Sequence, residues 1–174
     1  RANLVFVLML IVTDLLMVSL AFWAAYWLRQ LIAVPPPVNI GPFAEYAGMM
    51  LIHVVTIPTL FFFSRLYDVK RSTPRLDEFY RIFAATSIGT IVTVALTTFL
   101  FKNSTLELDF PRAMVLYGWF ITVVLVTFSR TALVLLRNWL RKRGVWTDRL
   151  LIVGTGDVGR MILQSAQQSP NLGY

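Results

Sequence analysis

The chain has 174 residues, of which 57% are hydrophobic and only 14% are charged. A soluble domain has about 45–50% apolar and about 25% charged residues, so a soluble fold of this size would be left with too apolar a surface. The absence of cysteine and the modest numbers of glycine and proline also exclude a disulfide scaffold, a collagen-like chain and a disordered chain. The composition therefore predicts a polytopic membrane protein.

Four stretches are long and apolar enough to cross a bilayer, which requires about 20 residues of helix. They are Leu4–Leu28, Phe43–Phe63, Ile82–Phe101 and Ala113–Leu136. Before the third stretch, apolar side chains recur at helical spacing at Leu76, Phe79, Tyr80 and Phe83. This spacing predicts an amphipathic helix at the membrane surface that leads into the third span, and a role in binding a partner is left open.

Basic residues are unevenly distributed between the loops, and this asymmetry sets the direction of the spans. Ser64–Arg81 and Arg137–Arg149 hold five each, whereas Arg29–Pro42 holds one and Lys102–Arg112 holds two. The segments rich in arginine are expected in the cytoplasm, so both chain ends are predicted to lie inside. The net charge of +7 is interpreted as basic flanks facing anionic lipid, and no nucleic-acid partner is predicted.

Three polar side chains stand out inside the predicted spans: Asp14, His53 and Arg130. Ionisable groups in a bilayer are costly and usually face protein or water. Asp14 and Arg130 are both expected in the cytoplasmic half, where pairing would lower the desolvation cost of each. Alternatively, Arg130 reaches lipid phosphate and Asp14 bonds a nearby hydroxyl. A transport or proton-relay role is a further alternative, although repeated halves and interrupted helices are missing.

His53 is interpreted as a neutral, hydrogen-bonded residue between helices. A metal site is not predicted, because the chain has one histidine and no cysteine.

After the four predicted spans, the next apolar run is Leu150–Val153, which is too short to cross a membrane and is typical of a buried strand. Gly154, Gly156 and Gly159 follow in the pattern G-x-G-x-x-G and precede a helical segment. This context is typical of a Rossmann-like unit, whose helix N-terminus offers free amides to a phosphate. The three glycines are therefore the candidate phosphate or nucleotide loop. Whether a nucleotide binds is left open, because the acidic residue expected about 20 positions further on would fall at or beyond Tyr174.

The predicted fold class is thus a membrane all-α protein, in which a four-helix transmembrane bundle is followed by the start of a Rossmann-like α/β domain (strand, glycine loop, helix). The expected domains are a four-span transmembrane domain over residues 1–143 and an incomplete cytoplasmic Rossmann-like domain over residues 144–174. The first residue is Arg1 and the chain stops just after the glycine loop, which favours a piece of a longer protein.

The order of these features resembles the N-terminal half of the large bacterial polyprenyl-phosphate sugar-1-phosphate transferases, which initiate exopolysaccharide and O-antigen synthesis. The resemblance covers nearly the whole chain and rests on the order and spacing of several segments. They are DLLMVSLAFWAAYWLR at Asp14–Arg29, Arg65-Leu66-Tyr67 followed by Arg71 and Asp77-Glu78, Phe128-Ser129-Arg130, RLLIVGTGDVGR and the ending SPNLGY.

The resemblance implies that the full-length protein is an enzyme that moves a sugar-1-phosphate from a UDP-sugar to undecaprenyl phosphate with Mg²⁺. Its catalytic Asp-Glu pair belongs to a C-terminal domain that this chain lacks, so no catalytic residue is assigned here. The chain would be the anchoring and regulatory part at the bacterial inner membrane. Its implied partners are membrane lipid and polyprenyl phosphate, with the UDP-sugar bound through the missing domain. The sugar and the oligomeric state are left open, a homo-oligomer being one alternative.

The same features fit two other functions. Membrane-bound nucleotide-sugar 4,6-dehydratases or epimerases of polysaccharide synthesis share the plan of four spans and a Rossmann start. Their glycine loop usually reads closer to G-A-G-x-A-G, from which Thr155 and Val158 depart. The second alternative is a non-enzymatic membrane scaffold or transporter.

Overall fold

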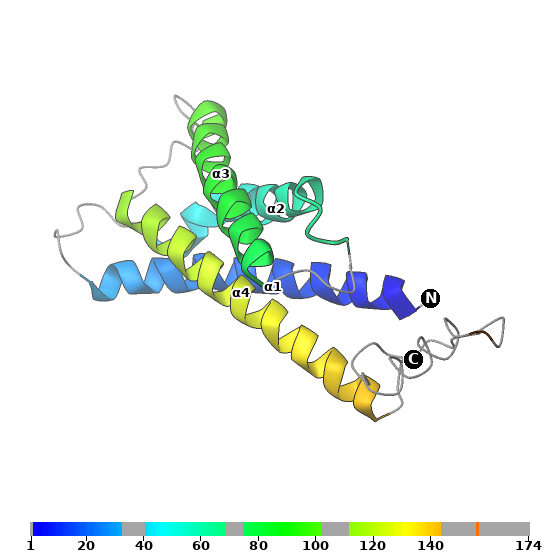
Figure 1. Cartoon of the computed structure of the whole chain (residues 1–174). Coiled ribbons are helices and arrows are strands. Elements are labelled where there is room, and N and C mark those ends of the chain that lie inside the picture. Colours follow the sequence, from blue (N-terminus) through cyan, green and yellow to red (C-terminus); the bar gives the residue numbers. More distant parts are fainter. Residues whose placement is uncertain (1, 33–40, 69–74, 102–111, 144–155, 157–174) are drawn as a thin grey trace. The chain divides into compact units, whose positions relative to one another are not determined.

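The computed structural model describes residues 2–32, 41–68, 75–101, 112–143 and 156, and its regular structure over these ranges is entirely helical. The α-helices are α1 (Ala2–Leu31), α2 (Ala47–Phe63), α3 (Arg75–Phe101) and α4 (Arg112–Lys142), and a short 3-10 helix, η1 (Phe43–Tyr46), leads directly into α2 (Figure 1). Pro58 lies within α2, which continues as a helix on both sides of it.

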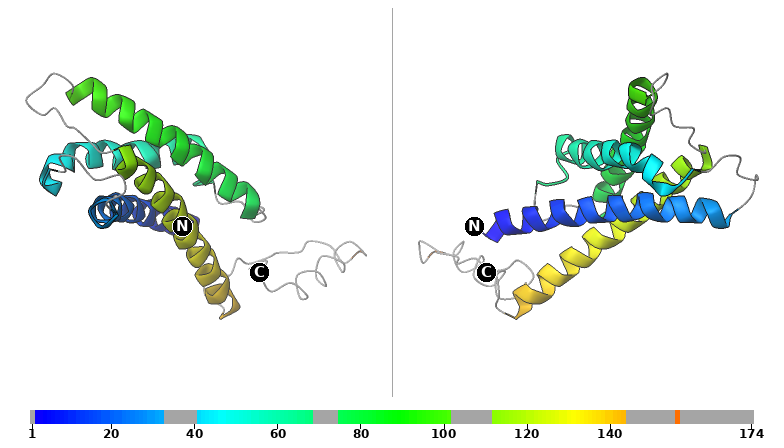
Figure 2. Two further views of the ribbon diagram at one scale, coloured as in Figure 1. Left: turned by 90° about the vertical axis from the view of Figure 1, so that its left-hand side faces the viewer. Right: turned by 180° about the vertical axis from the view of Figure 1, so that it is seen from behind.

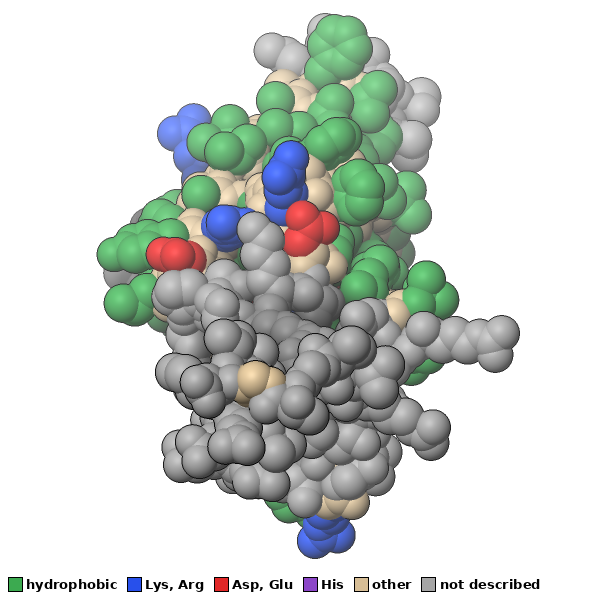
Figure 3. Space-filling view, turned by 45° about the vertical axis from the view of Figure 1, so that its right-hand side comes forward, with side chains coloured by type: hydrophobic (Ala, Val, Ile, Leu, Met, Phe, Trp, Pro, Cys, Tyr) green, Lys and Arg blue, Asp and Glu red, His purple; other side chains and the backbone are tan. Residues whose placement is uncertain are grey.

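Within the described ranges, four helical segments are long and apolar enough to cross a membrane: Leu4–Leu31, Phe43–Phe63, Leu76–Phe101 and Arg112–Leu140. The prediction of four membrane-spanning helices is therefore confirmed in length and composition. Large apolar side chains are exposed along all four α-helices, and Figure 3 shows them covering much of the described part of one face. An exposed surface this apolar matches hydrocarbon better than water.

The second span keeps its predicted bounds, Phe43–Phe63. The helices α1, α3 and α4 extend further than the predicted spans, because backbone hydrogen bonding continues where the apolar pattern stops. The amphipathic segment expected before the third span is the beginning of α3 itself, and the helix runs unbroken from Arg75 to Phe101. Its apolar side chains at Leu76 and Tyr80 are exposed, as expected for groups that meet lipid.

The strand, glycine loop and helix predicted after residue 147 lie outside the described residues, except for Gly156. The Rossmann-like start and the domain boundary at residues 143/144 therefore stay predictions.

The chain divides into two compact units, one over Asn3–Ser129 and the other over Arg130–Tyr174. The first unit contains α1, η1, α2, α3 and the part of α4 that ends at Ser129. In the second unit the described part continues α4, and the guanidinium of Arg143 lies 3.9 Å from the centre of the Trp139 ring, a cation–π contact that covers the end of the helix.

The closest helix packing in the first unit joins α2 to α3. Figure 2 gives two further views of these helices. A Cβ atom placed on Gly89 of α3 would come within 2.5 Å of Ile57 Cδ1, and one placed on Gly48 of α2 would come within 2.9 Å of the Phe101 ring. The start of α2 thus lies at the end of α3, so the two helices run antiparallel. Small residues at the contact allow the close approach that membrane helices need.

Aromatic side chains hold α1 against η1, the short helix that leads into α2. The Tyr26 ring lies 5.2 Å from that of Phe43 and 5.6 Å from that of Tyr46, and its hydroxyl donates a 3.1 Å hydrogen bond to the Gly41 carbonyl. Tyr26 and Tyr46 belong to a buried cluster with other residues of α1, α2 and α4, namely Phe22, Ala25, Met49 and Met114. Three members of the cluster, Phe22, Met49 and Met114, also line the pocket described below.

The C-terminus of α2 ends in a left-handed turn at Arg65, whose φ is 54°. The amide of Leu66 donates to the Phe61 carbonyl and the amide of Arg65 donates to the Phe62 carbonyl, each at 3.0 Å. This pair of bonds is the Schellman motif, which satisfies carbonyls that the end of a helix would otherwise leave open. Glycine is the usual residue at the left-handed position, so an arginine there is unusual.

Candidate functional site

A row of buried threonines runs along one face of α3. Thr86, Thr90, Thr93 and Thr97 recur at the spacing of a helix face, and their exposed fractions are 0%, 8%, 1% and 1%. The hydroxyl of Thr90 donates to the Thr86 carbonyl at 2.9 Å, and that of Thr93 donates to the Gly89 carbonyl at 2.8 Å. These bonds within the helix let Thr90 and Thr93 face the interior without an unmet donor. Among the described residues, no hydrogen-bond partner reaches the buried hydroxyls of Thr86 and Thr97.

His53 of α2 reaches this row at Thr93. Its side chain is 4% exposed, and its Nδ1 lies 3.3 Å from Thr93 Oγ1. The single hydroxyl hydrogen of Thr93 is already directed at the Gly89 carbonyl, so the hydroxyl oxygen accepts and His53 Nδ1 donates. In the neutral ring the hydrogen is therefore assigned to Nδ1, and Nε2 carries a lone pair.

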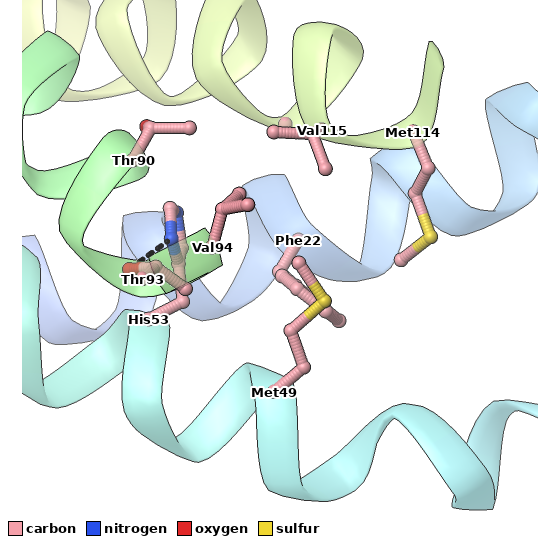
Figure 4. Close-up of a pocket in the computed structure, with 9 residues that line it drawn as sticks. Phe22, Met49, His53, Thr90, Thr93, Val94, Met114 and Val115 are labelled. Atoms are coloured by element: carbon pink, nitrogen blue, oxygen red, sulfur yellow. Dashed lines mark hydrogen bonds between the residues drawn. The ribbon is translucent and has the colours of Figure 1, made fainter. Parts of the chain in front are cut away.

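A small cavity lies beside the imidazole (Figure 4), and about 20 Å³ of it is open to water-sized molecules. All four α-helices contribute to its wall within the first unit. The lining residues are Phe22 from α1, Met49 and His53 from α2, Thr90, Thr93 and Val94 from α3, and Met114, Val115 and Gly118 from α4. The wall is mostly apolar, and its polar groups are confined to the histidine and the two threonines.

Besides the His53–Thr93 contact between α2 and α3, a polar contact also joins α3 to α4. The indole Nε1 of Trp119 donates a 3.0 Å hydrogen bond to Ser87 Oγ, which itself donates to the Phe83 carbonyl at 2.7 Å. The Phe83 and Trp119 rings meet edge to face at 5.4 Å between their centres. The contact pairs the polar edge of the indole and keeps its rings against apolar neighbours.

Asp14 and Arg130, the two charged residues singled out within the spans, are both buried. Asp14 is 0% exposed and Arg130 is 2% exposed. They belong to different units of the chain, and their pairing stays a prediction.

Of the three glycines in the candidate phosphate loop, Gly154 and Gly159 lie outside the described residues. Gly156 is exposed, and a Cβ placed on it would meet no atom within 4 Å. The use of this loop for a phosphate or nucleotide stays a prediction. In the described part of the chain, no three His, Asp or Glu side chains gather where they could hold a metal ion.

In a comparison with families of known proteins, a family model described as a CoA-binding domain matches residues 63–174. The chain belongs to this CoA-binding domain family. The match covers more than half of the chain and takes in α3, α4 and the predicted glycine loop. Domains of this family are found in polyprenyl-phosphate sugar transferases. Comparison with curated proteins and with solved structures finds no match.

The threonine face and the walls of the cavity were not anticipated from the sequence. The spacing of Thr86, Thr90, Thr93 and Thr97 is visible in the printed sequence and could have indicated a polar helix face. The family match begins at Phe63, so α1 and nearly all of α2, including His53, lie before the matched family segment.

Proposed function

We propose that the chain is the membrane-anchoring and regulatory part of an enzyme that transfers a sugar-1-phosphate from a UDP-sugar to undecaprenyl phosphate, and so initiates exopolysaccharide or O-antigen synthesis. One observation carries the proposal. A domain of a family found in polyprenyl-phosphate sugar transferases occurs in a chain with four helices of spanning length.

The physical argument concerns the two substrates. A UDP-sugar is soluble and charged, whereas undecaprenyl phosphate is held in the lipid by its hydrocarbon tail. An enzyme that joins them must keep its active site at the membrane surface, and four apolar helices supply far stronger attachment than a single lipid anchor. The arginine-rich segments place both chain ends in the cytoplasm under this proposal, on the side of the nucleotide-sugar pool.

In this assignment the helices anchor and orient the enzyme at the bacterial inner membrane. Gly154, Gly156 and Gly159 bind the phosphate of a regulatory nucleotide, with CoA as the first ligand to test because the family is named after it. The Mg²⁺ that the transfer needs belongs to the catalytic domain. In the described part of this chain no cluster of three His, Asp or Glu side chains fits it, and no step is assigned to it here.

The test is an assay of the full-length protein with undecaprenyl phosphate in lipid nanodiscs and UDP-sugars labelled in the sugar. In the proposed reaction the lipid phosphate attacks the sugar-linked phosphorus, the phosphoanhydride bond to UMP breaks, and UMP leaves. We expect label in the organic phase and an equal amount of UMP. Reactions without lipid phosphate are the control.

Absence of lipid-linked label with every UDP-sugar would exclude the transferase. A labelled sugar that stays water-soluble, loses water and gains a keto group would instead identify the dehydratase. Absence of both the transferase and the dehydratase activity would favour a scaffold or transporter.

A further inference from the structure

We infer that the cavity beside His53 is a binding site for one internal water molecule, which donates a hydrogen bond to His53 Nε2. The inference concerns the helical part of the chain alone and is independent of the proposed enzymatic activity.

The first step is the hydrogen-bonding state of the ring. His53 Nδ1 donates to Thr93 Oγ1, because the threonine's hydrogen is used at the Gly89 carbonyl. The remaining nitrogen, Nε2, is an acceptor. Among the residues that the structure describes, no donor reaches it, although it is fully buried. An acceptor left unpaired in an apolar interior is destabilising, because it has lost its hydrogen bonds to water, and a bound donor would restore one of them.

The second step is the room available. A water molecule needs roughly 10–15 Å³ of space open to its own centre, and the cavity offers about 20 Å³. This is enough for one water and too little for a sugar, a nucleotide or a lipid headgroup. The apolar wall offers no other donor to the ring.

The third step is a second partner, since an internal water needs at least two. Thr90 lines the same cavity as His53 and Thr93 (Figure 4). The Thr90 hydroxyl donates its hydrogen to the Thr86 carbonyl, so its oxygen can still accept a hydrogen bond. One water can donate one hydrogen to His53 Nε2 and the other to Thr90 Oγ1. It would thereby add a second link between α2 and α3, beside the direct bond from His53 to Thr93.

The chain has a single histidine, so labelling histidine with ¹⁵N gives one pair of ring signals. We would measure these by solid-state NMR on the full chain in phosphatidylethanolamine and phosphatidylglycerol vesicles. The expected result is a hydrogen on Nδ1, an Nε2 signal in the hydrogen-bonded acceptor range, and a cross-peak from Nε2 to water protons. A hydrogen on Nε2, or an Nε2 signal without contact to water, overturns the inference.

Two pairs of variants sharpen the test. Val94→Leu adds a methylene group to the cavity wall and should abolish the water cross-peak while the hydrogen stays on Nδ1. Val124→Leu is the matched control on the exposed side of α4 and should leave the signals unchanged. Persistence of the cross-peak in Val94→Leu contradicts the site.

The second pair tests the ring assignment. Thr93→Val removes the acceptor for Nδ1 and should move hydrogen toward Nε2, with loss of the water-donated bond. Thr93→Ser keeps the hydroxyl and should resemble the wild type. An unchanged ring in Thr93→Val would contradict the hydrogen-bonding scheme. The wild-type spectrum decides the inference even where a variant fails to fold.

Discussion

Arg130 is 2% exposed and lies seven residues before Arg137 on the same helix. A buried charge is tolerated in a membrane helix only with polar neighbours, and removal of one partner of a buried pair costs about 3–5 kcal/mol. We predict that Arg130→Leu lowers the yield of folded protein in detergent more than Arg137→Leu, because Arg137 is only half-buried. Size-exclusion chromatography of the two variants measures this.

Equal yields from the two leucine variants would remove the case for a buried partner of Arg130. Asp14 is the predicted partner, and it is buried as well. A combined Asp14→Asn, Arg130→Leu variant should then lose less than the sum of the two single changes, since each change removes the same interaction.

At this scale the sequence identified the residues but not all of their neighbours. Hydropathy alone marks Asp14, His53 and Arg130, because charged and polar groups are rare in spans. The contact of His53 with Thr93 could not be predicted in the same way. It depends on the rotation of α3 about its axis, which the packing of Gly89 against Ile57 sets.

Among the elements, the α2–α3 contact makes a specific prediction at Gly89. Alanine there would place its Cβ 2.5 Å from Ile57 Cδ1. Ile57 is fully buried, so its side chain has little room to turn away, and such overpacking typically costs about 1–3 kcal/mol. We predict that Gly89→Ala destabilises the protein and that Ile57→Val, which removes the Cδ1 methyl, relieves part of the loss. Unfolding in mixed micelles of increasing denaturing detergent measures the effect.

Gly118→Ala is the matched control for this experiment. Its Cβ would lie 3.7 Å from Ala25 Cβ, an ordinary van der Waals contact, so alanine should be neutral or stabilising in the helix. Additive effects of Gly89→Ala and Ile57→Val would argue against the contact.

The C-terminus of α2 gives a prediction of the opposite sign. Arg65 occupies a left-handed conformation with φ of 54°, which costs an L-residue with a Cβ about 1–2 kcal/mol. Arg65→Gly should therefore stabilise the protein by about 0.5–1 kcal/mol, after the greater chain entropy of glycine is counted. Arg81→Gly, inside α3, should instead destabilise by about 1 kcal/mol. The same sign for both changes would contradict the role of the Schellman motif.

Hydropathy predicted the existence and number of the spanning helices well, since about 20 apolar residues have few alternatives in a bilayer. It placed their ends less well. The apolar pattern predicts that the first span ends at Leu28, directly before Arg29, whereas α1 continues to Leu31. The Arg29 side chain folds back to donate to the Ile32 carbonyl at 2.9 Å, so a charge at this position does not end the helix.

For the whole molecule, the direction of the spans is the prediction with most consequence. The chain has no cysteine, so each introduced cysteine is a unique reporter. We expect a membrane-impermeant maleimide to label Asn39→Cys and Ser104→Cys in intact cells, and Asp68→Cys and Tyr174→Cys only after permeabilisation. Labelling of Tyr174→Cys in intact cells would reverse the topology and separate the glycine loop from cytoplasmic nucleotide-sugars.

The antiparallel contact between α2 and α3 also limits how the protein can be divided. A fragment cut at residue 63, where the family match begins, would keep the hydroxyl-bearing face of α3 but lose the helix that shields it. Such a fragment should aggregate or be degraded when made alone. Synthesis of residues 1–62 as a separate peptide in the same cell should restore it by complementation, so the two pieces form one cooperative folding unit.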